Sequence, residues 1–303
     1  MREVTAKCPG HLTGIFQICD EPEDPLLKGS RGAGVSITHG VTTKVKVERA
    51  PRSHFKIRIN GVPTTDAIVS EHVLRTLLQH TTSDYNIEVD HKLEVPMGAG
   101  FGSSGGGALS LALALNEALN LGLSRVEAAQ VAHISEVECK TGLGTVVGEA
   151  HGGFGIRVKP GGPGIGKIEW IPLPRDYVVV CLSFGPLSTR NILTNEDTRK
   201  RINMAGGVLL EKLIQNPSPK YFMELSRKFT EYVGLVSKKV DKVLKEAESL
   251  DLPCTMAMLG ESIFSLVYRE DAEEILELFR RHASRGDFLI VSEVDNEGAR
   301  ILE

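Results

Sequence analysis

Apolar and polar residues alternate in two early stretches of the chain, residues 41–48 and 54–60, and this period of two predicts β-strands. Asn60 and Gly61 end the second stretch and predict a tight turn. We also expect strands at residues 85–95 and 153–158, where apolar residues again occur in short extended runs. The first half of the chain therefore contributes several strands.

Helices are expected between these strands. Asp66 can cap a helix that runs to about residue 80. Residues 104–121 are apolar almost all round, which is typical of a helix buried under a sheet. Ser124 and Glu127 have the spacing of a capping box and predict a further helix that runs to about residue 138. The first half thus mixes strands and helices.

The second half predicts a split ferredoxin-like unit, because its elements follow the order β-α-β-β-α-β when the long helical segments count as one layer. These elements are a strand at 176–184, helical segments from 199 to about 250, strands at 254–259 and 263–268, a helix at 271–282 and a strand at 288–294. A tight Gly-Glu-Ser turn is expected between the two short strands. We predict an α+β protein with two domains, residues 1–172 and 173–303.

The amino-acid composition argues against several classes of protein. With 303 residues, 41% of them hydrophobic and 24% charged, the chain can fill a packed core. Its net charge of -4 and the lack of a long Lys/Arg run argue against nucleic acid or an anionic membrane as a partner. No stretch approaches a membrane span, and the five scattered cysteines contain no CxxC pair. We expect a cytoplasmic enzyme.

A glycine-rich loop at residues 95–107, VPMGAGFGSSGGG, is the most informative stretch. It contains the dinucleotide fingerprint GxGxxG, but the second strand and ribose-binding acid expected about 20 residues on fall in a helix. The Walker A pattern fails because no lysine follows the glycines. Backbone N–H groups of such a loop and the following helix N-terminus bind phosphate, and Ser103 or Ser104 can add a hydroxyl. Alternatively, the serines only cap the helix and the glycines only pack.

The segment Pro96-Met-Gly-Ala-Gly-Phe-Gly-Ser-Ser104 resembles the phosphate-binding motif of the GHMP kinases, the superfamily of galactokinase, homoserine kinase and mevalonate kinase. Lys7-Cys-Pro-Gly-His11 and Met258-Leu-Gly-Glu-Ser-Ile-Phe264 resemble two further motifs of that family, in the same order. The resemblance implies an N-terminal domain with a left-handed βαβ crossover, a ferredoxin-like C-terminal domain, and ATP in the cleft between them. It also implies a homodimer, because GHMP kinases are often dimers.

By this resemblance, ATP contacts the glycine loop and the third motif. The residues assigned to it are Pro96, Gly98, Gly100, Phe101, Gly102, Ser103, Ser104, Gly105, Gly260 and Ser262. Motifs at residues 9–14, 29–34, 141–144 and 151–153 are similar to one branch, the archaeal pantoate kinases. That similarity implies pantoate as the phosphoryl acceptor and 4-phosphopantoate, a precursor of coenzyme A, as the product.

Phosphoryl transfer requires Mg²⁺, and the resemblance implies that a glutamate of the helix at 124–138 shares the ion with Ser104. Helical spacing puts Glu136 between Ala129 and Ala132, where another element can approach closely, and puts Glu138 on the solvated face. We expect Glu136 to be the ligand, although it can also be an ordinary solvated acid.

Many GHMP kinases carry a catalytic Asp where this chain has Thr145, which cannot serve as a carboxylate base. Glu149 is close in sequence, but its register does not match the motif. Some members, homoserine kinase among them, work without the acid, so Mg²⁺ and backbone dipoles can lower the barrier instead. The identity of a base stays open.

A substrate carboxylate calls for a fixed cation, and Arg157 is the first choice because a guanidinium binds carboxylates with two hydrogen bonds. Arg31 and Arg190 are alternatives, and any of the three can instead form a surface ion pair. The remaining residues assigned to the substrate are His11, Ser30, His133 and Thr189. A lone His on a helix, such as His133, is more often structural.

Other functions stay open at this point. A GHMP kinase can act on another small hydroxy acid, such as homoserine or mevalonate. A nicotinamide-dependent oxidoreductase would use the GxGxxG segment, and a binding protein would keep the fold without catalysis.

Overall fold

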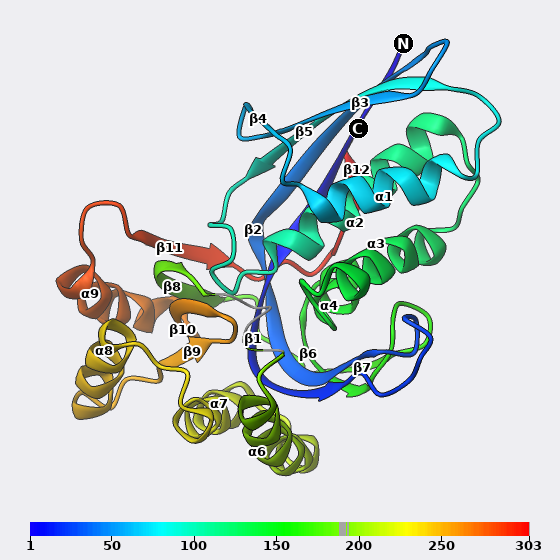
Figure 1. Ribbon diagram of the computed structural model, residues 1–303. Coiled ribbons are helices and arrows are strands. Elements are labelled where there is room, and N and C mark those ends of the chain that lie inside the picture. The colour runs from blue at the N-terminus through cyan, green and yellow to red at the C-terminus, as the bar shows by residue number, and fades with distance from the viewer. Residues whose placement is uncertain (188–191, 193, 303) are drawn as a thin grey trace.

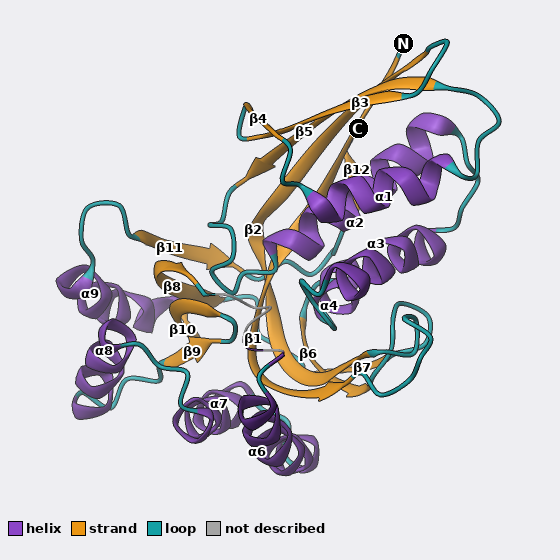
Figure 2. Cartoon of the chain, in the orientation of Figure 1, coloured by secondary structure: helices purple, strands orange, loops and turns teal. Residues whose placement is uncertain are grey.

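The computed structural model describes residues 1–187, 192 and 194–302. Two β-sheets form its framework. Helices cover one face of the first sheet, and others lie beside the second (Figure 1). Colouring by secondary structure makes the α+β character plain, since strands and helices are both abundant and often follow one another in runs of one kind (Figure 2). The predicted α+β fold class is confirmed.

The first sheet is built on two long antiparallel strands, β1 (Arg2–Cys19) and β2 (Gly29–Arg49). Its strand order is β12-β1-β2-β5-β3-β4, and β6 and β7 extend it beside the start of β2. The further strands are β3 (His54–Ile59), β4 (Val62–Thr64), β5 (Tyr85–Leu93), β6 (Phe154–Lys159), β7 (Lys167–Trp170) and β12 (Arg300–Leu302). β3 and β5 run parallel, and α1 (Ile68–Leu78) connects them as the helix of a βαβ crossover.

Helices α1, α2 (Ser103–Leu119) and α3 (Arg125–Cys139) lie together on one face of this sheet (Figure 1). As predicted, α2 is buried along almost its whole length, and the capping box of Ser124 and Glu127 opens α3. The predicted cap of α1 was wrong: Ala67 occupies the N-cap and no side chain caps this helix. A short helix, α4 (Thr145–His151), packs next to α2 and α3 and was not predicted.

The second sheet has the strand order β11-β8-β10-β9, which is that of the predicted ferredoxin-like unit. Its strands are β8 (Tyr177–Pro186), β9 (Thr255–Ala257), β10 (Gly260–Tyr268) and β11 (Phe288–Glu293). Its helices are α6 (Glu196–Gln215), α7 (Pro219–Val233), α8 (Lys238–Ser249) and α9 (Ala272–His282), with a 3₁₀ turn at Arg269–Asp271. The predicted Gly-Glu-Ser turn was wrong, because Gly260 already begins β10 and the chain reverses at Leu259, whose φ is 67°.

One hydrophobic core joins the second sheet to the curved ends of β1 and β2. Phe16 of β1 packs on Phe229 of α7, with ring centroids 5.8 Å apart, and Phe154 of β6 packs on Phe222 at 5.0 Å. The last strand, β12, returns to the first sheet and pairs with β1. The division at residues 172 and 173 stays a prediction, and β12 belongs by pairing to the first sheet. No helix among the described residues has the length and apolar character needed to cross a membrane.

The β9–β10 hairpin holds the glycine loop in place. A Cβ on Gly260 would lie 1.9 Å from the Ala99 carbonyl oxygen, so only glycine permits this contact. Ser262 Oγ donates to the same carbonyl at 2.6 Å. The hairpin of the second sheet thus fixes the backbone of a loop that belongs to the first.

Replacing Gly260 with Ala should therefore lower the free energy of unfolding by about 1 to 3 kcal/mol, because the loop or the hairpin must shift to admit the methyl group. Urea unfolding measures this loss. Gly207→Ala in α6 is the matched control, since its Cβ meets only the Gln17 side chain at ordinary contact distance. That variant should be neutral or slightly stabilising, and an equal loss in both would contradict the proposed packing role.

Candidate active site

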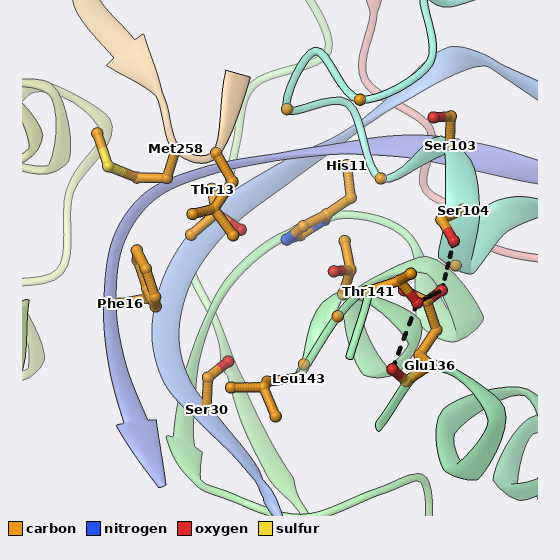
Figure 3. Close-up of a pocket in the computed structure, with 18 of the residues that line it drawn as sticks. His11, Thr13, Phe16, Ser30, Ser103, Ser104, Glu136, Thr141, Leu143 and Met258 are labelled. Atoms are coloured by element: carbon orange, nitrogen blue, oxygen red, sulfur yellow. Dashed lines mark hydrogen bonds between the residues drawn. The ribbon is translucent and has the colours of Figure 1, made fainter. Parts of the chain in front are cut away.

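A cavity lies where the glycine loop, the second half of β1, the start of β2, α3, α4 and the β9–β10 hairpin meet (Figure 3). Many of the residues predicted from the sequence line it: His11, Ser30, Gly98, Gly100, Gly102, Ser103, Ser104, Gly105, Glu136 and Arg157. Many of the residues chosen from the sequence therefore gather around one cavity.

The glycine loop follows a backbone path that favours glycine. Gly98, Gly100 and Gly102 have φ values of 67°, 85° and 71°, in the left-handed region. Gly102 is also the N-cap of α2, and no side chain accepts a hydrogen bond from the first turn of this helix. Those N–H groups and the positive end of the helix dipole suit a bound anion such as phosphate.

Glu136 and Ser104 meet at the wall of the cavity. Ser104 Oγ donates to Glu136 Oε1 at 2.5 Å, and Thr141 Oγ1 donates to the same oxygen at 2.7 Å (Figure 3). Glu136 is only 3% exposed, and this burial raises its pKa, while the bonds from Ser104 and Thr141 oppose the rise. The helical-spacing argument for Glu136 agrees with this arrangement, since Glu138 lies exposed and pairs with His72 instead.

The carboxylate of Glu136 and the hydroxyl of Ser104 fit a Mg²⁺ ion whose other ligands are water and phosphate. Among the described residues, no three potential ligands gather into a closed metal cage. Mg²⁺ commonly takes one or two protein ligands and completes its shell with water and substrate phosphates. A buried carboxylate and a hydroxyl at the first turn of α2 supply such a set, next to the place suited to phosphate.

Arg157 reaches the cavity from β6 and is held by a buried chain of hydrogen bonds. Its Nη1 donates to His11 Nε2 at 3.1 Å, so His11 carries its proton on Nδ1 and donates it to Ser36 Oγ at 3.1 Å. Burial, and then the Arg157 charge, lowers the pKa of His11 to about 3. Burial lowers the pKa of Arg157 to about 10, which leaves it charged at neutral pH.

Four predicted ATP residues do not line the cavity. Phe101 is fully buried and packs edge-on against Phe288, with centroids 5.8 Å apart. Gly260 and Ser262 contact the back of the glycine loop at Ala99 rather than the cavity. Pro96 lies just before the loop and is likewise absent from the lining. The assignment of these four residues to ATP stays a prediction, and in the structure they lie outside the cavity lining.

The structure does not bring Arg31 or His133 to the cavity. Successive residues of a strand face opposite sides, so Ser30 faces the cavity while Arg31 faces α6, where it pairs with Glu211. His133 Nε2 donates to the carbonyl oxygens of Pro25 and Lys28 at 3.2 and 3.0 Å, which is a structural role. Thr189 and Arg190 lie outside the described residues.

The sequence prediction missed several lining residues, namely Thr13, Phe16, Thr141, Gly142, Leu143, Gly144, Thr145, Met258 and Leu259. The run TGLG at 141–144 was a signal, because two glycines beside a predicted helix indicate close backbone approach. A Cβ on Gly142 would indeed lie 2.3 Å from Glu136 Oε2. Phe16 and Leu259 gave no local signal.

Stability should depend on pH through His11. The unfolded chain takes up this proton below about pH 6.5, whereas the folded protein does not until about pH 3. The free energy of unfolding should therefore fall as pH drops through this window, by about 2 to 3 kcal/mol at pH 4.5 from this group alone.

His11→Gln removes this titration while its amide oxygen can still accept from Arg157. Urea unfolding at pH 7 and pH 4.5 should show a smaller loss in the variant than in the unchanged protein. His91 also titrates low, with a pKa near 4 because of burial, and it contributes equally to both proteins. Equal losses in the two proteins would contradict the neutral state of His11.

Known proteins resemble this chain in both sequence and fold. Residues 68–153 match the family model described as GHMP kinases N terminal domain. A solved structure described as a phosphotransferase related to the CoA biosynthesis pathway superposes with a TM-score of 0.88 at 32% identity, covering 99% of this chain and 98% of that one.

Two curated relatives match over nearly the full length. Pantoate kinase of Thermococcus kodakarensis is 37% identical over 281 residues, 91% of either chain. Pantoate kinase of Methanocaldococcus jannaschii is 35% identical over 274 residues, covering 90% of this chain and 96% of that protein. These similarities show that the chain belongs to the GHMP kinases. Within that family it stands with the pantoate kinases, as the motifs around residues 9–14 and 141–144 predicted.

Proposed function

We propose that this protein transfers the γ-phosphoryl group of ATP to a hydroxyl of pantoate and forms 4-phosphopantoate. The main observation that supports the proposal is that Arg157 is buried at the cavity and keeps an N–H donor unpaired within the described part of the chain. Arg157 lines the cavity, is 4% exposed, and has a buried Nε with no hydrogen-bond partner among the described residues. A buried N–H donor that is left unpaired is costly unless a ligand completes it, and a small carboxylate does so.

The walls of the cavity suit an acceptor that carries both a hydroxyl and a carboxylate. Ser103, Ser104 and Glu136 lie on one side, and Thr13, Phe16 and Ser30 lie on the other (Figure 3). His11 lies between them and fixes Arg157 through its hydrogen bond. Pantoate bound by its carboxylate at Arg157 would direct its hydroxyl toward the phosphate-binding loop. The curated relatives named pantoate kinase support the same acceptor.

We further propose ATP and Mg²⁺ as the cofactors, since GHMP kinases use both. The backbone of Gly98–Gly105 would hold the phosphates, and Glu136 with Ser104 would hold the ion. When bound, Mg²⁺ supplies charge neutralisation for the transferred group. Burial keeps the Glu136 carboxylate in one orientation, so little reorganisation is needed at the moment of transfer.

The experiment is a panel of small alcohols assayed for ADP release with ATP and Mg²⁺. Pantoate should be turned over, whereas homoserine, mevalonate and shikimate should react slowly or not at all. ³¹P NMR of the product should show a phosphomonoester on the primary alcohol. Turnover of homoserine without turnover of pantoate would move the function to another member of the family. Protection by NAD rather than ATP in a thermal-shift assay would indicate an oxidoreductase.

The family resemblance also leads us to propose a homodimer. Light scattering of the purified protein measures its mass, and a value near 33 kDa would contradict the dimer because one chain weighs 32.9 kDa.

A further inference from the structure

The cavity has an apolar part that neither the Ser104–Glu136 pair nor Arg157 explains. Among the described residues that line the cavity, the apolar ones other than glycine are Phe16, Leu143, Met258 and Leu259. None of them belongs to the glycine loop or to α2, where the proposed phosphate and Mg²⁺ sites lie. Phosphates and a hydrated ion gain nothing from apolar contact, because burying charge beside apolar groups costs free energy. These residues therefore suit the phosphoryl acceptor rather than the nucleotide.

Leu143 stands between the two groups proposed to hold the ends of the acceptor. The glycines on either side of it each approach one of these groups. A Cβ on Gly142 would lie 2.3 Å from Glu136 Oε2, at the proposed metal site. A Cβ on Gly144 would lie 3.3 Å from Arg157 Nε, at the proposed carboxylate site. Three successive residues span roughly 7 Å, which is comparable with the length of a four-carbon hydroxy acid, so the side chain of Leu143 falls beside the middle of such an acid.

Phe16 supplies a second apolar surface on the same side of the cavity. Its side chain is buried, and its ring packs edge-on against Phe229 of α7, with centroids 5.8 Å apart. This contact fixes the ring at the curved end of β1. In Figure 3, Phe16 and Leu143 lie with Ser30 across the cavity from Ser104. We call Phe16 and Leu143 together the apolar wall.

Leu143 also separates the cavity from charged surroundings. It borders a second cavity, whose lining includes Lys28, Lys140 and Arg199. An apolar side chain at this boundary keeps those charges away from the middle of the acceptor. A shorter side chain at position 143 would open the acceptor site toward them.

We infer that the apolar wall binds the two methyl groups on the quaternary carbon of pantoate and thereby selects the acceptor. The inference rests on the proposed function. Pantoate and 2,4-dihydroxybutanoate share the carboxylate, the secondary hydroxyl and the primary hydroxyl, and they differ only in the two methyl groups on C3. When the carboxylate binds Arg157 and the primary hydroxyl points toward the glycine loop, C3 lies between them, next to Leu143. The polar groups of the cavity would hold both acids alike, so the discrimination comes from the apolar wall.

The test is a competition between these two acids in one reaction with ATP and Mg²⁺, with the two phosphorylated products separated by mass. The ratio of product rates gives the ratio of the two kcat/KM values, and it does not depend on how much of the protein is folded. The unchanged protein should favour pantoate by about tenfold or more, since burying two methyl groups contributes a factor of that size.

Leu143→Ala should lower this preference by about threefold or more, because the methyl groups lose their contact with the side chain. Measured separately, kcat/KM should fall for pantoate and stay within about twofold for 2,4-dihydroxybutanoate. Leu143→Met keeps an apolar side chain of similar volume and should keep the preference. Phe16→Ala should also lower the preference by about threefold or more. Its fold is at greater risk, and the competition reads the ratio from whatever fraction is active.

A merely structural role gives a different pattern, because a displaced Glu136 or a partly unfolded protein lowers turnover of both acids equally. Equal losses for the two acids in Leu143→Ala would therefore overturn the inference, as would an unchanged protein that turns over both acids at the same rate. In that case pantoate is still phosphorylated and the proposed function stands. An unchanged protein that phosphorylates neither acid would contradict the proposed function, and the role of the apolar wall with it.

Discussion

Ser104→Ala and Glu136→Gln should each lower kcat by about 10²-fold or more. The two side chains share a hydrogen bond at the first turn of α2, where the proposed site would hold the transferred phosphoryl group. Groups that stabilise such charge act mainly in the transition state, so kcat falls more than substrate affinity. Steady-state kinetics with pantoate and ATP measure the effect. Titrating Mg²⁺ should show a raised half-saturating concentration for both variants.

Glu138→Gln is the matched control for this expectation. The residue stands on the same helix as Glu136, but it is exposed and contacts His72 at 2.7 Å, away from the cavity. Its kcat should stay within about twofold of the unchanged protein. A crippled Glu138→Gln beside a mild Glu136→Gln would mean that the metal ligand has been assigned to the wrong face of α3.

Arg157→Ala should raise KM for pantoate by about 10- to 150-fold, because a charge-assisted bond in a closed site contributes roughly 1.5 to 3 kcal/mol. KM for ATP should barely change, since the proposed nucleotide site is on the glycine-loop side of the transferred group. Arg157→Lys should recover only part of the loss, because an ammonium group cannot reproduce the planar fork. Pantoyl lactone, in which ring closure consumes both the carboxylate and the primary hydroxyl, should be inert.

Arg31→Ala controls for a general loss of positive charge near the site. Arg31 pairs with Glu211 and with the carbonyl oxygen of Val158, outside the cavity. Its removal should leave KM for pantoate within about twofold. If Arg31→Ala abolishes pantoate turnover while Arg157→Ala leaves it intact, the carboxylate binds at residues 29–34 instead.

Local signals explain which elements could be predicted. The capping box of α3 lies within four residues and its meaning does not depend on the rest of the fold. β1 was missed because Pro9 and Gly10 interrupt its alternation, and the pairing with β2 slips at that point and again between Thr13 and Ile15. The turn at Leu259 was misplaced because a leucine with positive φ is held there by packing, which no local propensity indicates.

The residues of the candidate site likewise divide into those with a local sequence signal and those that only the tertiary structure brings together. Glu136 could be chosen over Glu138 because helical spacing is a local property. The bond between Arg157 and His11 joins residues 146 positions apart, so only the folded sheet reveals it. The position of Glu149 behind Gly102 depends on how α4 packs against the glycine loop, and a sequence register cannot supply that contact.

The pairing of β12 with β1 has a consequence for how the protein is made. Synthesis proceeds from the N-terminus, so β1 is made long before Arg300–Leu302, its partner along one edge. The outer edge of β1 near Thr5–Lys7 must wait for the whole second sheet before it is covered, and an exposed strand edge invites pairing with other chains. Removing the pairing of residues 300–302 would leave that edge uncovered. Such a change alters no residue that lines the cavity, yet it should favour aggregation of the enzyme.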